Sequence, residues 1–238
     1  MQPNSAAPAA ESRWPGQLAA IDLGSNSFRL EIAQLHGGHY RRVDYLKETV
    51  RLGGGLDARG HLSDEATARG LECLGRFARR LDGFLASQVR AVATQTLREA
   101  KNRDAFLVRA QGVLGLPIEI ISGREEARLI FAGVARLQPS TAPRLVIDIG
   151  GRSTEMILGS ASVPRVAESF QVGCVSLSMR YFGDGRYTRA AFRAAQIAAG
   201  AELEEGLQQF AHRRGREVLG SSGTAGRISS RPNCAHSV

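Results

Sequence analysis

The sequence of 238 residues lacks any long hydrophobic run. No stretch approaches the roughly 18 consecutive apolar residues of a membrane-spanning helix, so we expect no membrane span. Cysteine is also scarce: the three cysteines lie far apart, which argues against a disulfide framework and favours a reducing cytoplasm. Residues 1–16 lack the apolar core of a signal peptide and are expected to form a disordered tail.

Lysine is nearly absent from the basic residues. Of the 31 lysines and arginines only Lys47 and Lys101 are lysines, and the formal net charge is +8. This charge is compatible either with a mildly basic surface or with a polyanionic partner such as a nucleic acid, a nucleotide or polyphosphate. The sequence has no long basic block and no aromatic residues interleaved with basic ones, so no nucleic-acid partner is expected.

What the sequence does contain is an internal repeat. Residues 19–30 (AAIDLGSNSFRL) resemble residues 145–156 (LVIDIGGRSTEM), with isoleucine, aspartate, glycine and serine at matching positions. Each copy is typical of an apolar strand, an aspartate, a glycine-containing turn and a second strand, which together predict a hairpin. Successive backbone N–H groups in such a turn form an anion-binding hollow, and serine hydroxyls add donors. The two copies therefore suggest two related lobes that face one phosphate.

Strands alternate with helices along the rest of the chain, which favours an α/β fold. The expected strands lie at residues 40–52, 89–94, 118–121, 163–172 and 217–219, and the expected helices at 63–85, 105–114 and 188–210. The helix at 63–85 carries apolar residues at three- and four-residue spacing, so one of its faces should pack on a sheet.

Two further helices are expected to begin with the capping-box pattern S/T-x-x-E, at 96–99 and at 122–125. Each follows an apolar strand, so each should begin at the carboxyl end of a strand, where α/β sheets place their ligands. The pattern gives Glu99 and Glu125 a structural role as capping residues.

Two charged residues in these helix starts have no capping role. Arg98 would lie in a first helical turn, where the helix dipole disfavours a cation, so it is a candidate phosphate ligand; an arginine that simply reaches solvent is the alternative. Glu126 follows the capping glutamate and is a candidate general base that deprotonates water. The alternative for Glu126 is the ordinary preference of helix N-termini for acidic residues.

The chain resembles the exopolyphosphatase/guanosine pentaphosphatase (Ppx/GppA) family, in the superfamily of sugar kinases, Hsp70 chaperones and actin. The segments that carry this resemblance are 20–28 (AIDLGSNSF), 94–98 (TQTLR), 121–127 (ISGREEA), 146–155 (VIDIGGRSTE), 173–176 (GCVS) and 220–224 (GSSGT). The resemblance implies an actin-like α/β fold of two lobes, duplicated on a ribonuclease H-like pattern. A homodimer is an assembly that it leaves open.

The resemblance also implies how the chain divides. It places a first actin-like lobe at residues 17–138 and a partial second lobe at 143–224. Residues 225–238 show no helical periodicity and resemble nothing in the family, so they are expected to form a disordered tail of a truncated or frame-shifted chain. A shortened second lobe would leave an unpaired sheet edge and uncovered apolar faces.

By resemblance, the chain is expected to be a Mg²⁺-dependent hydrolase of phosphoanhydrides. It would release orthophosphate from the end of inorganic polyphosphate or from guanosine pentaphosphate. Arg98 would hold a phosphoryl group, and Glu126 would be the catalytic base. The implied phosphate-binding residues are Asp22, Gly24, Ser25, Asn26, Ser27, Gly150, Gly151, Arg152, Ser153, Ser222, Gly223 and Thr224. Asp148, Glu155 and Asp22 would place the metal, directly or through water.

One residue departs from the family pattern within the second turn. The family has three consecutive glycines there, and Arg152 takes the place of the third. Arg152 would either strain the turn, if its φ is positive, or add a phosphate contact. A polyphosphate- or alarmone-binding module without turnover is the alternative to an enzyme, and a kinase of the same superfamily fits the 125–127 segment less well.

Overall fold

Each copy of the sequence repeat forms an antiparallel hairpin. We describe a computed structural model, which places residues 12–211 and 217–229. In the first copy β1 (Gln17–Leu23) pairs with β2 (Ser27–His36), and in the second β6 (Arg144–Ile149) pairs with β7 (Thr154–Ser160). The predicted duplication of the hairpin is therefore confirmed.

Each hairpin begins a mixed sheet, and the strands of the second sheet follow the same order as the first four strands of the first sheet. The remaining strands are β3 (His39–Thr49), β4 (Val89–Ala93), β5 (Ile118–Ile120), β8 (Val163–Phe170) and β9 (Glu217–Gly220). The first sheet has the order β3-β2-β1-β4-β5, with β4 parallel to β1. The second has the order β8-β7-β6-β9, with β9 parallel to β6. The expected actin-like α/β fold of two related lobes is confirmed, and the described part of the second sheet has no fifth strand.

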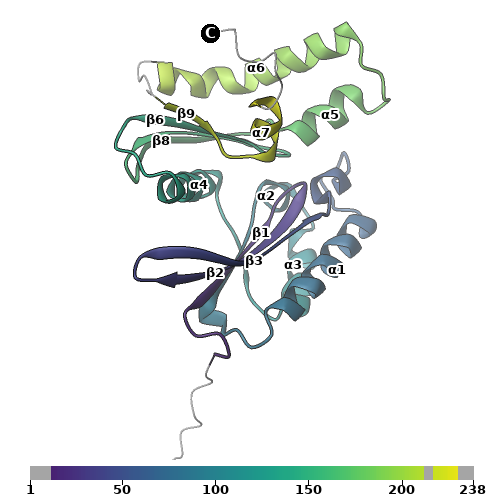
Figure 1. The fold of residues 1–238 in the computed structure, drawn as a ribbon. Coiled ribbons are helices and arrows are strands. Elements are labelled where there is room, and N and C mark those ends of the chain that lie inside the picture. Colours follow the sequence, from purple (N-terminus) through teal and green to yellow (C-terminus); the bar gives the residue numbers. More distant parts are fainter. Residues whose placement is uncertain (1–11, 212–216, 230–238) are drawn as a thin grey trace, which may run out of the picture.

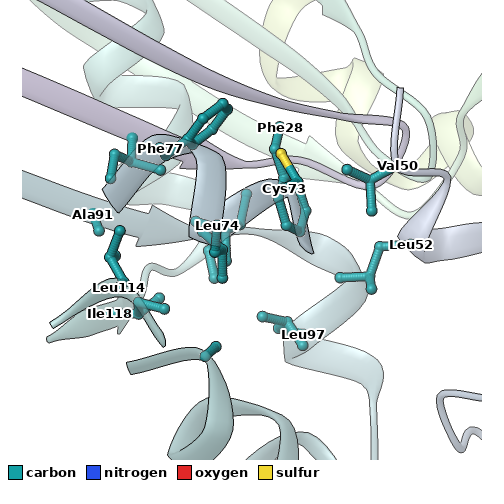
Figure 2. Packing of buried hydrophobic residues seen from close by; sticks show 14 of the residues in the cluster. Phe28, Val50, Leu52, Cys73, Leu74, Phe77, Ala91, Leu97, Leu114 and Ile118 are labelled. Atoms are coloured by element: carbon teal, nitrogen blue, oxygen red, sulfur yellow. The ribbon is translucent and has the colours of Figure 1, made fainter. Parts of the chain in front are cut away.

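The first lobe packs two helices on one face of its sheet. They are α1 (Asp64–Arg80) and α3 (Arg103–Leu114). Ser63 caps α1 by accepting a hydrogen bond from the N–H of Ala66. Figure 2 shows the core between sheet and helices, where Phe28, Leu74 and Phe77 are fully buried. Short helices connect the larger elements: η1 (Leu52–Gly55), η2 (Ala86–Gln88) and α2 (Gln95–Glu99).

The second sheet is covered on both faces (Figure 1). Its helices are α4 (Gly123–Leu137), α5 (Cys174–Phe182), α6 (Arg189–Ala211) and α7 (Gly223–Ser229). Phe131 of α4 packs with Val146 and Ile157 on one face, while Leu177 of α5 and Leu203 of α6 contact a cluster on the other. The prediction that the first lobe extends to residue 138 is therefore wrong for α4, because its apolar side is part of the core of the second lobe.

The two expected tails are partly structured. Trp14 donates from its indole nitrogen to the carbonyl of Asp82 at 2.9 Å and lies near Phe84, so residues 12–16 are not a disordered tail. Helix α7 includes residues 225–229, which were expected to lack structure. Residues 1–11 and 230–238 lie outside the described residues. Among the described helices, none has the length and apolar character needed to cross a membrane.

Candidate functional site

A cavity of about 620 Å³ lies between the two lobes and is lined by both hairpin turns. Asp22 and Asp148, the matching aspartates of the repeat, both line this cavity. The prediction that the two copies face one phosphate requires this arrangement. All but two of the predicted site residues line this cavity. They are Asp22, Gly24, Ser25, Asn26, Ser27, Glu126, Asp148, Gly150, Gly151, Ser153, Glu155, Ser222, Gly223 and Thr224. The two exceptions are Arg98 and Arg152.

The two turns have the same tight backbone. A Cβ added to Gly24 would lie 2.9 Å from the carbonyl oxygen of Ser27, and one added to Gly150 would lie 2.9 Å from that of Ser153. Contacts this short do not occur at real Cβ atoms, so both positions need glycine. A Cβ on Gly151 would lie 3.3 Å from Cβ of Ser25, which shows how closely the two turns approach each other.

Helix α5 is held by the second turn. The N–H of Cys174 donates to the carbonyl of Gly150 at 3.0 Å, and the N–H of Val175 donates to that of Gly151 at 2.7 Å. These bonds satisfy donors of the first helical turn, which have no partner inside a helix. The second turn and α5 therefore form one unit.

The capping box expected at residues 96–99 is not present at the start of helix α2. The helix begins at Gln95, and no side chain caps it. Thr96 instead donates from its hydroxyl to Oγ of Ser25 at 2.8 Å and so supports the first turn. Arg98 lies in the last turn of α2, where the helix dipole favours a cation. The argument that helix position makes Arg98 an anion ligand is therefore wrong.

The second predicted helix start has the serine half of the expected capping box, whereas the Glu125 carboxylate binds Arg128 instead of reaching back to the start of the helix. Ser122 is the N-cap of α4 and accepts a hydrogen bond from the N–H of Glu125 at 3.2 Å. The carboxylate of Glu125 accepts N–H bonds from Arg128, outside the cavity, whereas Glu126 lies on the cavity wall. The separation of the two neighbouring glutamates agrees with the sequence interpretation.

Arg98 binds Glu126. One terminal nitrogen of its guanidinium donates to Oε2 of Glu126 at 3.0 Å and to the carbonyl of Ile121 at 2.8 Å. Burial raises the pKa of Glu126 to about 8, with a further upward contribution from the negative charge of Glu155, while Arg98 acts in the opposite direction. A carboxyl group with this pKa exchanges protons near neutral pH, which suits a general base.

Carboxylates are concentrated around Glu126. Burial is also the main cause that raises the pKa of Asp22 and of Glu155, and the negative charge of Asp148 adds to both shifts. Arg29 opposes the shift at Asp22, and hydrogen bonds from Ser169 and Ser153 oppose it at Glu155. The cavity therefore carries negative charge that a bound cation would stabilise.

Sequence reasoning missed two cations on the cavity wall, Arg29 and Lys47. Arg29 lies opposite Asp22 in the hairpin and bonds it at 3.1 Å. Two signals were available: Lys47 is one of only two lysines, and Arg29 occupies the repeat position that Glu155 fills in the second copy.

The sequence and the fold agree on one family. A model of the Ppx/GppA phosphatase family matches residues 31–236. The chain belongs to this family. A curated Haemophilus influenzae protein with the name "Putative exopolyphosphatase" is 45% identical over 208 residues, which are 87% of this chain and 64% of that protein. The chain thus spans slightly less than two thirds of this relative.

Solved structures of Ppx/GppA proteins have the same fold. The crystal structure of an exopolyphosphatase-like protein matches with a TM-score of 0.83 and 29% identity, over 89% of this chain and 67% of that one. The Aquifex aeolicus PPX-GPPA enzyme matches with a TM-score of 0.72 and 28% identity, over 89% of this chain and 69% of that one. The family model reaches residue 236, so the expectation that family likeness stops at Thr224 is wrong.

Arg152, the departure from the Ppx/GppA glycine pattern, lies in a place that neither sequence alternative anticipated. Among the described non-glycine residues only Arg51 and Ala161 have a positive φ, so Arg152 does not strain the turn in that way. Its guanidinium bonds the carboxylate of Glu99 at 2.5 Å and the carbonyl of Gly53 at 3.2 Å, across the lobe boundary. In this structure the side chain is engaged by the first lobe.

Proposed function

We propose that the inter-lobe cavity hydrolyses phosphoanhydride bonds and releases orthophosphate from the end of inorganic polyphosphate. The observation that carries the proposal is the meeting of both hairpin turns at one cavity, with Glu126 on its wall. Membership of a phosphatase family and likeness to a protein with the name "Putative exopolyphosphatase" support a hydrolase. The activity of the whole protein is part of the proposal, because the chain spans 64% of that relative.

The terminal phosphoryl group would bind between the two turns. Backbone N–H groups of tight glycine turns and the hydroxyls of Ser25 and Ser153 provide donors for phosphate oxygens. Arg29 and Lys47 add positive charge to the same wall, which favours a polyanionic substrate over a neutral one. Thr96 fixes the hydroxyl of Ser25 before substrate binds.

Magnesium is part of the proposal. Asp22, Asp148 and Glu155 line the cavity and offer only oxygen donors, which suit a hard cation. Within the described residues, no group of three or more potential ligand side chains is close enough to hold an ion by itself. Magnesium usually keeps several waters and binds through one or two carboxylates together with substrate phosphates, and these residues fit that mode. When bound, it would neutralise charge on the phosphoryl oxygens.

Glu126 would act on the attacking water. Its carboxylate would accept a proton from the water as the new P–O bond to the terminal phosphorus forms. The bridging P–O bond then breaks, the shortened polyphosphate leaves with the bridging oxygen, and the hydrated phosphoryl group is released as orthophosphate. Arg98 binds Oε2 of Glu126 and the carbonyl of Ile121, so it holds the carboxylate in one orientation. Arg98 also favours the ionised form that a base requires, against the effect of burial.

The decisive experiment compares Glu126→Gln with Glu125→Gln in a phosphate-release assay. We expect Glu126→Gln to lower kcat on long-chain polyphosphate by about 10²–10⁴-fold, because the amide cannot take a proton, while binding of polyphosphate persists. Glu125→Gln is the matched control, since its carboxylate pairs with Arg128 outside the cavity. Near-normal turnover by Glu126→Gln would remove the assignment of the base.

The same assay distinguishes the alternatives. Guanosine pentaphosphate is run in parallel with polyphosphate, because the same groups could bind either phosphate end. Each substrate is tested with Mg²⁺ and after chelation, and activity that persists after chelation would refute the magnesium part. Binding of both anions without release of orthophosphate would instead assign a binding module.

A cytoplasmic location is proposed with this function. Cys73 and Cys174 are free thiols, and Cys73 is buried, which suits a reducing compartment. A homodimer stays a prediction.

A further inference from the structure

Five polar side chains form a continuous hydrogen-bonded series from the second turn to Glu126. Arg152 donates to Oε2 of Glu99, and Oε1 of Glu99 accepts from the amide of Gln95 at 2.6 Å. Oε1 of Gln95 accepts two bonds from Arg98, at 2.7 and 3.0 Å. Arg98 then donates to Glu126. Only Arg152 in this series belongs to a turn of the second lobe.

The series has a fixed direction. The amide of Gln95 donates to Glu99 and accepts from Arg98, and the opposite orientation would place its NH₂ group against a guanidinium, which has no acceptor. Glu99 therefore sets the orientation of Gln95, which in turn orients Arg98. The exposed fractions of the side chains at the two ends are low, 18% for Arg152 and 17% for Glu126, so solvent screening of these bonds is limited.

The first lobe leaves room for the Arg152 side chain. A Cβ added to Gly53 would lie 2.7 Å from Cδ of Arg152 and 2.9 Å from Oγ1 of Thr96. The adjacent Gly54 has open space by comparison, with only Cβ of Arg51 at 4.0 Å. Arg152 thus passes through a gap that exists because residue 53 is glycine.

We propose that Arg152 is a positioning residue: its bond to Glu99 fixes α2 across the lobe boundary, so that α2 holds Arg98 on Glu126. Helix α2 touches three parts of the site, because Thr96 holds the first turn, Arg98 holds the base and Glu99 holds the second turn. The kinetic part of this inference rests on the proposed function, whereas the pairing itself does not.

The test separates positioning from phosphate binding by removing Glu99. If Arg152 bound phosphate, Arg152→Gln would raise KM for polyphosphate, and Glu99→Gln would release Arg152 and lower KM. Positioning predicts that both variants lower kcat by about tenfold or more and leave KM within about twofold. The double variant should be no slower than the slower single variant, because both substitutions break the same bond. Opposite effects of the two variants, or losses that multiply, would overturn the proposal.

Three further variants control for general damage. Gly53→Ala should reproduce the loss of kcat because its methyl group displaces Arg152, whereas Gly54→Ala should not. Arg136→Ala removes another arginine contact between the lobes, from α4 to the carbonyl of Gly38, and should leave kcat unchanged. Equal losses of kcat in Arg136→Ala and Arg152→Gln would mean that the loss of any contact between the lobes lowers kcat. This result would contradict a specific role of Arg152.

A wild-type protein that releases no orthophosphate would refute the proposed function without deciding the pairing. Thermal unfolding then decides it. Arg152→Gln, Glu99→Gln and the double variant should share one decrease in Tm of about 2–4 °C. Additive decreases, or none, would show that the Arg152–Glu99 pair does not connect the lobes.

Discussion

The two hairpins have the same backbone conformation but different charged side chains. Each aspartate precedes a turn in which glycine packs on a serine carbonyl. The residue paired with the aspartate across the strands is Arg29 in the first hairpin and Glu155 in the second. Arg29 binds Asp22, whereas Glu155 adds a second carboxylate beside Asp148. The position paired with the aspartate is therefore cationic in the first hairpin, where it is Arg29, and anionic in the second, where it is Glu155.

Under the proposed function, this difference suits the two walls to separate tasks. The first hairpin balances its own aspartate and offers net positive charge with Lys47, so it suits phosphate oxygens. The second hairpin concentrates negative charge, which suits a cation. A phosphoanhydride with a bound magnesium ion presents both kinds of charge, and the asymmetry between the copies matches it.

The largest expected effect comes from removing the negative charge of Glu155. Glu155→Gln should lower magnesium-supported phosphate release by about 10²-fold and raise the magnesium concentration needed for half-maximal rate, because one oxygen ligand loses its charge. Titration of Mg²⁺ in the phosphate-release assay measures both. Glu168→Gln is the matched control, since this neighbouring carboxylate pairs with Arg124. If the two variants respond equally to magnesium, the assignment of the second wall fails.

The shared backbone predicts equal sensitivity of the two turns. Gly24→Ala and Gly150→Ala should each destabilise the fold by about 1–3 kcal/mol, because each methyl group meets a serine carbonyl at the same distance. Urea unfolding measures the change. Gly133→Ala, in α4 with open space around it, should instead be neutral or stabilising by up to about 1 kcal/mol. Strongly unequal losses at Gly24 and Gly150 would show that the turns are not equivalent.

The charge of Glu155 should also be visible in the pH profile. A base must be deprotonated, and the pKa of Glu126 is raised to about 8, so kcat/KM should increase with pH up to about that value. Glu155→Gln removes a negative charge that raises this pKa, and the rising limb should therefore move to lower pH. The profile is measured at constant magnesium; a shift to higher pH would contradict this reading of the site.

The smallest effect is expected from removing the positive charge of Arg29, measured as a change in the free energy of unfolding. Asp22 lies deep between the cavity walls, which raises its pKa, but 35% of its side chain and 43% of that of Arg29 are still accessible to solvent. Because solvent screens such a pair, Arg29→Gln should cost less than about 1 kcal/mol in urea unfolding. Arg42→Gln, which removes the pair with Glu31 in the same sheet, provides the comparison. A much larger cost for Arg29→Gln would mean that Asp22 depends on it far more than exposure suggests.

Local pattern was sufficient to predict both turns. The repeat predicted the hairpins because their strands and glycines are adjacent in sequence, and both glycines occur where the backbone needs them. Ser122 was likewise recognised as a helix cap from four consecutive residues. The separation of Glu125 from Glu126 was predicted from the same pattern, although Arg128 and not the cap engages the Glu125 carboxylate. Features fixed within a few residues were therefore predictable.

Contacts between distant segments were not predictable in this way. Arg98 was placed in a first turn because the T-x-x-E pattern at 96–99 imitates a cap, while α2 begins at Gln95 and has only five residues. The packing of α4 on the second sheet depends on tertiary contacts that amphipathic spacing cannot reveal. The bond from Arg152 to Glu99 joins residues 53 positions apart.

The bonds between α5 and the second turn have a consequence for the peptide planes. In a trans peptide the C=O and the following N–H point in opposite directions. The carbonyls of Gly150 and Gly151 point at α5, so the N–H groups of Gly151 and Arg152 point away from that helix. Any tilt of α5 must rotate these two peptide units, and the amide resonances of Gly151 and Arg152 will therefore report the movement of a helix to which neither residue belongs.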